Sequence, residues 1–198
     1  MSLSVGIVGL PNVGKSTLFN ALLQRQVALA ANYPFATIEP NHGIIEVPDL
    51  RLAELARLVQ TEVIKPATIE FVDIAGLVKG AHEGEGLGNQ FLSQIRNVDL
   101  ICHVLRAFCD EGIIREGATT PLVDLATIRT ELLLADLTVL EKQIEPKGVK
   151  DAALQARWQL IETWRAQLGQ EEVRLSERPL TEVEAKLARE LGLLTAKP

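Results

Sequence analysis

The strongest constraint on how this chain can fold is the stretch at residues 9–16, which reads GLPNVGKS. An apolar run at 3–8 precedes it and predicts a buried strand, and a helix-forming run at 16–24 follows it. Gly9 allows a tight turn and Gly14 lets backbone N–H groups approach an anion, which the N-terminus of the next helix also attracts. The spacing therefore predicts a strand, a phosphate-binding loop (P-loop) and a helix, in that order.

The P-loop predicts a ligand that carries phosphate groups. Lys15 is expected to reach the terminal phosphates, and the Ser16 hydroxyl is expected to coordinate Mg²⁺. The residues predicted to bind the nucleotide are Asn12, Val13, Gly14, Lys15, Ser16 and Thr17. The alternative, a glycine-rich turn with a solvated lysine, is disfavoured by the strand before the loop and the helix after it.

Asp73 is the second informative residue, because it ends an otherwise apolar predicted strand at 68–74. A buried carboxylate needs a partner, and phosphate-bound Mg²⁺, reached directly or through water, is one. The alternative is that Asp73 caps a helix. Asp73-Ile74-Ala75-Gly76 forms a DxxG element, in which the Gly76 N–H is expected to sense the terminal phosphate.

Residues 76–88 contain five glycines, a composition that favours conformational freedom and suits a switch segment. For His82, inside this segment, a solvated side chain is favoured over a chemical role. For His103, in a predicted strand at 99–108, a satisfied position in the core or at the sheet margin is favoured.

The first half alternates predicted strands and helices, which indicates an α/β fold with a mostly parallel sheet and flanking helices. Residues 30–42 predict a loop, 43–47 form a short apolar segment, and a helix is expected at 89–96. In the first helix, the residues expected to face the sheet are Leu18, Leu22 and Leu23. A further helix after Pro48-Asp49 is expected to bury Leu52, Leu55, Ala56 and Val59 on one face.

The second half predicts helices that pack on each other. Leu125, Ile128, Leu132, Ala135 and Val139 form one apolar seam. After a break at 146–148, a second seam is formed by Leu154, Trp158, Ile161 and Leu168, which predicts an antiparallel hairpin. Thr181 and Glu184 predict a capping box for a third helix. A hairpin buried against the domain and a projecting arm remain equally open.

Charge and composition exclude several classes of protein. A net charge of −6 argues against a dedicated duplex nucleic-acid binder, so no sequence-specific DNA partner is expected. No apolar run is long enough to cross a membrane and the N-terminus does not resemble a signal peptide, so a cytoplasmic location is predicted. Cys102 and Cys109 have no metal-ligand companions at suitable spacing and are expected to be reduced thiols.

Four segments together resemble the YchF, or Obg-like ATPase, family of translation-factor-class P-loop proteins: residues 9–17, 32–41, 71–81 and 84–89. The resemblance implies a G-domain with a coiled-coil arm at 122–170, a preference for ATP and association with ribosomes. It also implies Thr37 as a switch threonine on Mg²⁺, with Asp73 and Gly76 forming the second switch. The expected division is a nucleotide-binding part at 1–121, a helical coiled-coil insertion at 122–190 and a return to the G-domain at 191–198.

Two departures from related proteins bear on catalysis and base choice. Leu77, which the family shares, stands where GTPases carry a water-orienting glutamine. Arg115 stands where family members often carry a histidine. A guanidinium only donates hydrogen bonds, so Arg115 is a poor group for orienting water. No base-reading Asn-Lys-x-Asp segment is present. The chain is therefore expected to be truncated, to lack the last strands of the sheet and to discriminate poorly between ATP and GTP.

The predicted function is a slow, Mg²⁺-dependent nucleotide hydrolase that acts as a molecular switch, with Lys15 and Gly76 as the catalytic groups. K⁺ is a second candidate cofactor, because Asn12 occupies the position where some related proteins bind it. The alternatives are a GTP-specific GTPase and a non-catalytic module that nucleotide orders for docking. A P-loop kinase is weaker, since it needs an acceptor site and lid arginines.

Overall fold

The computed structural model describes residues 3–23, 41–76, 87–110, 112–114, 120–148, 151–170 and 175–198. Within these ranges lies a four-stranded sheet made of β1 (Leu3–Val8), β2 (Asn41–Glu46), β3 (Thr68–Asp73) and β4 (Leu100–His103). The strand order is β2-β3-β1-β4. β1 runs parallel to β3 and β4, whereas β2 pairs antiparallel with β3.

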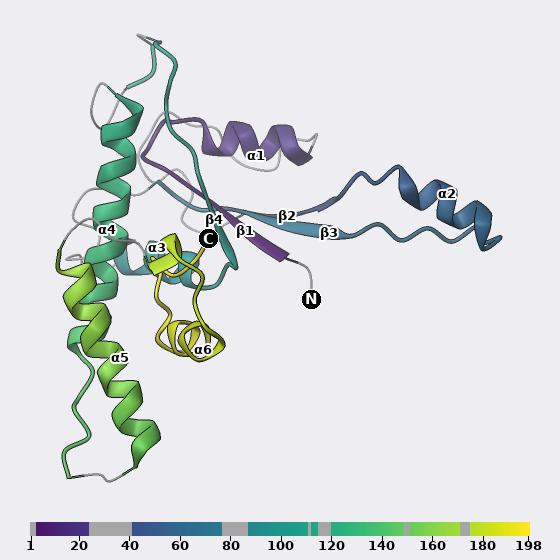
Figure 1. Ribbon diagram of the computed structural model, residues 1–198. Coiled ribbons are helices and arrows are strands. Elements are labelled where there is room, and N and C mark those ends of the chain that lie inside the picture. Colours follow the sequence, from purple (N-terminus) through teal and green to yellow (C-terminus); the bar gives the residue numbers. More distant parts are fainter. Residues whose placement is uncertain are drawn as a thin grey trace.

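The strands alternate with helices along the chain (Figure 1). The helices are α1 (Lys15–Leu23), α2 (Arg51–Leu58), α3 (Leu87–Arg96), α4 (Pro121–Glu141), α5 (Ala152–Leu168) and α6 (Glu182–Leu191), with a 3₁₀ turn at Leu175–Glu177. The predicted α/β class with a mostly parallel sheet is therefore confirmed.

Helices cover both faces of the sheet, because successive side chains of a strand point to opposite sides. On one face, Phe19 of α1 packs against Ile7, and both are fully buried. On the other face, α3 and α4 cover a core that includes Val8, Val72, Ile95 and Ile128.

The predicted contact face of α1 is wrong in two of its three residues. Leu18 and Leu22 are 37% and 36% exposed, and Phe19 is the fully buried residue. The stripe that meets the sheet is Phe19 with Leu23, four residues apart on one side of the helix. Leu23 packs so closely over β2 that a Cβ at Gly43 would lie 2.5 Å from its methyl groups.

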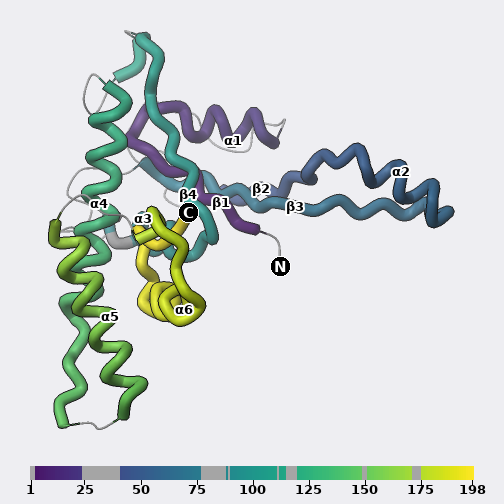
Figure 2. The backbone as a smooth tube through the Cα atoms, in the orientation of Figure 1, coloured from purple at the N-terminus to yellow at the C-terminus, as the bar shows by residue number. Residues whose placement is uncertain are grey.

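The β2–β3 connection extends away from the sheet and carries α2 at its far end (Figures 1 and 2). The predicted buried face of α2 is therefore largely wrong: Leu55 and Val59 are 54% and 70% exposed, and Ala56 alone in α2 is fully buried. In the described residues no other helix lies beside α2, so its exposed apolar residues have no helix to pack against there.

α4 and α5 lie side by side and run antiparallel, as predicted (Figure 1). One residue of the predicted second seam is wrong, since Leu154 is 41% exposed. The N-terminal half of α4 belongs to the domain core through Ile128 and Leu132. Its C-terminal half belongs to a second core, where Leu140 packs with Ile161 and Trp164 of α5. The end of the hairpin, at residues 142–148 and 151, lies away from the sheet in both views. The coiled-coil character and the proposed domain boundaries stay predictions.

The predicted strand at 99–108 is too long at its C-terminal end, since β4 ends at His103. Beyond it, residues 104–110 form no regular secondary structure, and Arg106 is buried and donates to the Asp110 carbonyl oxygen. Among the described helices, none is long and apolar enough to span a membrane.

Candidate nucleotide-binding site

The P-loop joins β1 to α1 at the C-terminal edge of the parallel strands. Asn12 has φ 59° and Gly14 has φ 101°, so the loop uses the left-handed region twice. The loop also packs tightly on the chain after β4, because a Cβ at Gly9 would lie 2.4 Å from the Val104 carbonyl oxygen. By contrast, a Cβ at Gly14 would meet nothing within 4 Å, so open space lies beside the loop at that point.

Lys15 begins α1 and is 7% exposed. Its Nζ donates a 2.8 Å hydrogen bond to the Leu10 carbonyl oxygen, within the P-loop itself. Burial lowers the pKa of Lys15 from 10.5 to about 8, and the Asp73 carboxylate opposes that shift. A buried ammonium beside a loop of backbone N–H groups favours a multiply charged anion.

Asp73 lies beside Ser16, although the two residues belong to different elements. Ser16 Oγ donates a 2.7 Å hydrogen bond to Asp73 Oδ2. Asp73 is 1% exposed, and burial raises the pKa of its carboxyl, while Ser16, Lys15 and Asn41 act in the opposite direction. Residues 74–76 are not helical, so Asp73 does not cap a helix at this point, which removes the alternative interpretation.

The chemistry of these groups fits a magnesium ion. A hydroxyl and a carboxylate are hard oxygen donors of the kind that Mg²⁺ prefers. Asp73 Oδ1 is buried and has no hydrogen bond among the described residues, so it has capacity for a further partner. P-loop GTPases in general use Mg²⁺ with the triphosphate.

Gly76 brings the end of the DxxG element onto the P-loop. A Cβ at Gly76 would lie 3.0 Å from both Cα and N of Pro11, so any larger residue would push against backbone. Lys15, Ser16, Asp73 and Gly76, predicted separately from two stretches of sequence, therefore meet at one end of the sheet.

Several predicted residues fall outside the part of the chain that the structure describes. Thr37, Leu77, His82 and Arg115 are among them. Within the described part, Val13 is buried in the core next to the loop, and Thr17 is on α1. Cys102 is half-buried on β4 and Cys109 is exposed, and both are free thiols. No metal-binding cluster of three or more His, Cys, Asp or Glu residues occurs among the described residues.

Sequence reasoning missed one participant, the chain after β4. Asn12 Nδ2 donates a 3.1 Å hydrogen bond to the Ile114 carbonyl oxygen, which ties the P-loop to that segment. The acceptor is a backbone atom, so no side-chain pattern marks it.

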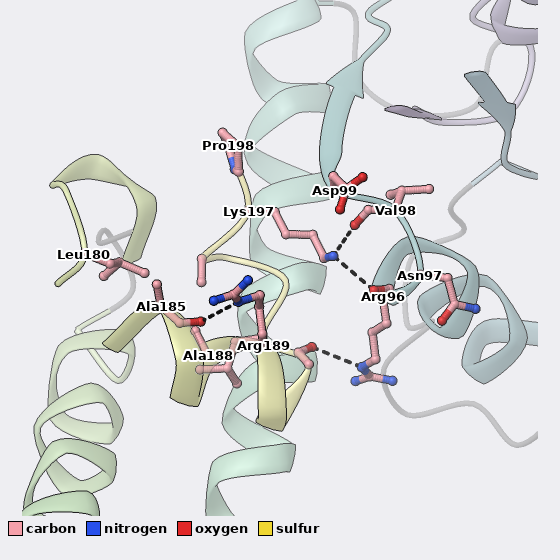
Figure 3. A pocket seen from close by; sticks show the side chains of 13 residues that line it. Arg96, Asn97, Val98, Asp99, Leu180, Ala185, Ala188, Arg189, Lys197 and Pro198 are labelled. Atoms are coloured by element: carbon pink, nitrogen blue, oxygen red, sulfur yellow. Dashed lines mark hydrogen bonds between the residues drawn. The ribbon is translucent and has the colours of Figure 1, made fainter. Parts of the chain in front are cut away.

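A separate cavity of about 360 Å³ lies near the N-terminal end of β4, away from the P-loop. Its walls come from the end of α3, from α6 and from residues 192–198 (Figure 3). Lys197 Nζ donates to the Arg96 and Val98 carbonyl oxygens there, and burial lowers the pKa of this lysine against the opposing effect of Asp99 and Asp136. These bonds connect the C-terminal segment to the turn before β4.

The fold and the site together define the class: a P-loop nucleoside-triphosphate-binding domain. A family model described as "50S ribosome-binding GTPase" matches residues 4–142. The chain belongs to this family of P-loop GTPases.

The relatives confirm the predicted resemblance to YchF. The chain is 50% identical to the ribosome-binding ATPase YchF of Bacillus subtilis and 48% identical to that of Escherichia coli O157:H7, covering 100% of this chain and 55% of each relative. The solved structure of the Schizosaccharomyces pombe YchF GTPase is 40% identical, with a TM-score of 0.73, and covers 100% of this chain and 55% of that one. The chain thus spans about half the length of the relatives it matches.

Proposed function

We propose that this chain is the nucleotide-binding and nucleotide-hydrolysing part of a ribosome-associated protein. ATP is the proposed main substrate and GTP the second one. The observation that carries the proposal is the meeting of Lys15, Ser16 and Asp73 at the end of the sheet next to an open P-loop. The names of the relatives, which are ribosome-binding ATPases, support ATP as the nucleotide and the ribosome as the partner. The cytoplasmic location stays a prediction.

Different residues are proposed to bind the phosphates and the magnesium ion. The N–H groups of residues 12–17 and the Lys15 ammonium bind the phosphates. Ser16 and Asp73, with Thr37, hold Mg²⁺, which when bound offsets the negative charge of the triphosphate. The Gly76 N–H is expected to sense the terminal phosphate, and the close approach of Gly76 to Pro11 of the P-loop supports this role.

Turnover is expected to be slow, because the aliphatic Leu77 cannot orient a water molecule. The Asn12 amide is a candidate ligand for K⁺ beside the phosphates. Phosphate release measured in KCl and in NaCl tests this point, and equal rates in the two salts would remove K⁺ from the proposal.

The main experiment measures Mg²⁺-dependent phosphate release by the unaltered protein and by Lys15→Ala, in this chain and in one that extends past Pro198. Loss of the buried ammonium is expected to lower the rate at least ~100-fold, the size reported for removing one preorganised charge-stabilising group. Equal rates in the two proteins would refute the proposed activity. An added comparison of ATP and GTP affinity in the two lengths tests base choice, and a strict GTP preference would favour the GTP-specific alternative.

A second candidate function is a non-catalytic module, in which nucleotide binding orders the protein so that it can dock on a partner. Leu77 is the observation that favours it. Single-turnover assays separate the two: binding without cleavage supports the module. Cosedimentation with ribosomes, in the presence and absence of a non-hydrolysable ATP analogue, tests the partner in either case.

A further inference from the structure

Arg106 is a buried charge that neither the P-loop nor the magnesium ligands explain. It is 3% exposed and follows β4 by three residues. Among the described residues, no carboxylate forms an ion pair with it. A guanidinium stays charged in proteins, and burying it is unfavourable unless its five N–H donors are used. Its surroundings must therefore be arranged around it.

The surroundings are backbone carbonyl groups. Nε donates to the Phe108 oxygen at 3.4 Å, Nη2 to the Asp110 and Ile113 oxygens at 3.1 and 3.2 Å, and Nη1 to the Ile114 oxygen at 3.4 Å. The guanidinium also lies 4.5 Å from the centre of the Phe108 ring. One side chain thus holds four backbone carbonyl groups, those of residues 108, 110, 113 and 114.

Arg106 and the P-loop share one hydrogen-bond acceptor. The Ile114 oxygen accepts from Arg106 and also from Asn12 Nδ2, at 3.1 Å. Asn12 is one of the two P-loop residues in the left-handed region, which asparagine tolerates better than most residues, and its side-chain hydrogen bond to Ile114 is long-range. The Ile114 carbonyl group therefore helps to hold the loop in the conformation in which its N–H groups converge.

We propose that Arg106 is a positioning residue for phosphate binding: it fixes the Ile114 carbonyl group, which in turn fixes Asn12 and the conformation of the P-loop. Arg106 touches no phosphate in this role. Its effect passes through two hydrogen bonds to a shared backbone oxygen. Loss of Arg106 is therefore expected to change nucleotide affinity more than the rate of the chemical step. The inference rests on the proposed function, since it assigns a residue that tunes the same site.

The chain contains a matched control. Arg165 of α5 also donates to backbone carbonyl groups, those of Leu140 and Gln143, and lies 5.3 Å from the Trp158 ring centre. It donates from α5 to α4, also forms a 2.6 Å ion pair with Glu162, and makes no hydrogen bond to the P-loop among the described residues. Arg106→Gln and Arg165→Gln therefore remove the same kind of group from two places, only one of which is connected to Asn12.

The experiment compares these variants with the unaltered chain by titration with a fluorescent ATP analogue in Mg²⁺. Arg106→Gln is expected to weaken binding about tenfold, which corresponds to ~1.4 kcal/mol, and Arg165→Gln is expected to leave affinity within twofold. Arg106→Lys keeps the charge but lacks the planar fork, so it should restore part of the affinity. Equal affinities for Arg106→Gln and the unaltered chain would overturn the proposal, as would an equal loss in both glutamine variants.

Hydrogen exchange in the nucleotide-free chain tests the same idea without any ligand. Arg106→Gln should speed exchange at the amides of residues 9–17, whereas Arg165→Gln should speed exchange only in the hairpin. Unchanged protection of 9–17 in Arg106→Gln would refute the inference even if the chain bound no nucleotide. A chain that binds no nucleotide would instead refute the proposed function.

A double-mutant cycle identifies the route. Asn12→Ala should weaken nucleotide binding by itself, and adding Arg106→Gln should then have little further effect, because both changes break the same chain of contacts. Additive losses would mean that Arg106 acts on the site by another path, contrary to the proposal.

Discussion

Lys15 and Asp73 place two opposite charges out of water at the same end of the sheet. Burial moves the pKa of each toward the neutral form, downward for Lys15 and upward for Asp73. Each is attracted by the other, but burial outweighs that attraction in both. The nucleotide-free site is therefore less stable than an apolar one of the same shape, a common property of sites built for charged ligands.

The first prediction follows from this imbalance: Lys15→Met should stabilise the nucleotide-free chain. The folded pKa of Lys15, about 8, is below its unfolded value of 10.5, so the folded state binds fewer protons between these pH values. The unfavourable contribution is complete below pH 8 and disappears as pH rises to 10.5. We expect a gain of about 1–3 kcal/mol at pH 7 in urea unfolding, given 1.36 kcal/mol for each pKa unit.

The gain should shrink between pH 8 and 10, in step with the loss of charge on Lys15. Lys147→Met, at an exposed position near the hairpin end, is the control and should change little at any pH. A Lys15→Met protein that is less stable than the unaltered chain at pH 7 would contradict the electrostatic argument.

At the scale of elements, α1 shows how a single bulky side chain sets the face on which a helix packs. Phe19 is fully buried against Ile7, while Leu18 and Leu22 lie at the edge of the contact. Phe19→Ala should reduce the unfolding free energy by about 3–5 kcal/mol, the usual range for a buried phenylalanine. Leu22→Ala is the matched change on the same helix and should cost less than ~1.5 kcal/mol, since that side chain is already partly in water. Similar losses in the two variants would show that α1 packs through a different face.

α6 carries a local stabilising device that can be tested by acid titration. Thr181 Oγ1 accepts from the Glu184 N–H, and the Glu184 carboxylate accepts from the Thr181 N–H, so the predicted capping box is confirmed. The hydrogen bond from Arg178, followed by that from the Thr181 backbone, lowers the pKa of Glu184 from 4.5 to about 2. Because the folded pKa is depressed, this stabilisation is complete above pH 4.5 and is lost as pH falls toward 2.

Glu184→Gln should therefore flatten the stability curve between pH 4.5 and 2 relative to the unaltered chain. Thr181→Ala should cost about 1 kcal/mol at neutral pH, as other N-cap losses do. The measurement is urea unfolding at a series of pH values, with Glu182→Gln on the same helical turn as control. An unchanged acid slope in Glu184→Gln would mean that the capping carboxylate does not titrate as described.

The sequence predicted features that depend on residues close together in the chain, and it failed for features that depend on residues far apart. The P-loop, the DxxG element and the capping box depend on residues a few positions apart, so spacing alone was enough to find them. The packing face of α1 depended on which side chain fits between strands from distant parts of the chain, and the predicted leucines were wrong. Arg106 lay inside a predicted strand, and its partners are backbone oxygens, which leave no trace in residue type.

At the scale of the whole molecule, Asp136 of α4 joins the helical hairpin to the C-terminal segment. Its carboxylate is fully buried and accepts from the Leu194 N–H at 2.8 Å, and from the N–H and hydroxyl of Thr195 at 2.8 and 2.7 Å. Burial nevertheless outweighs these bonds and raises the pKa of Asp136 from 3.8 to about 6. The hairpin is therefore anchored at its base by one side chain that contacts residues near position 195.

Asp136→Asn should destabilise the chain by about 1–3 kcal/mol at pH 7, because an amide group would present donors where a carboxylate oxygen accepts two bonds. The difference in stability from the unaltered chain should grow as pH falls from 7 to 4. Because the folded pKa of Asp136 is raised, the folded state takes up a proton before the unfolded state does, and the stability of the unaltered chain rises as pH falls from about 6 to 3.8. Glu141→Gln, at an exposed position on α4, is the control for thermal and urea unfolding. A difference that shrinks toward acid pH would contradict the role assigned to burial.

The C-terminal segment also has a consequence for how the protein is made. Leu194 belongs to the same buried cluster as Val8 and Ile101, and the Ile101 N–H donates to the Pro198 carbonyl oxygen. During synthesis, the sheet can form as soon as β4 has emerged, but one part of its apolar face has no cover until residues 194–198 leave the ribosome. Non-local closure of this kind folds slowly and exposes apolar surface in the meantime. The protein is therefore expected to depend on protection by chaperones until its last described helix has been completed and its C-terminal segment has docked.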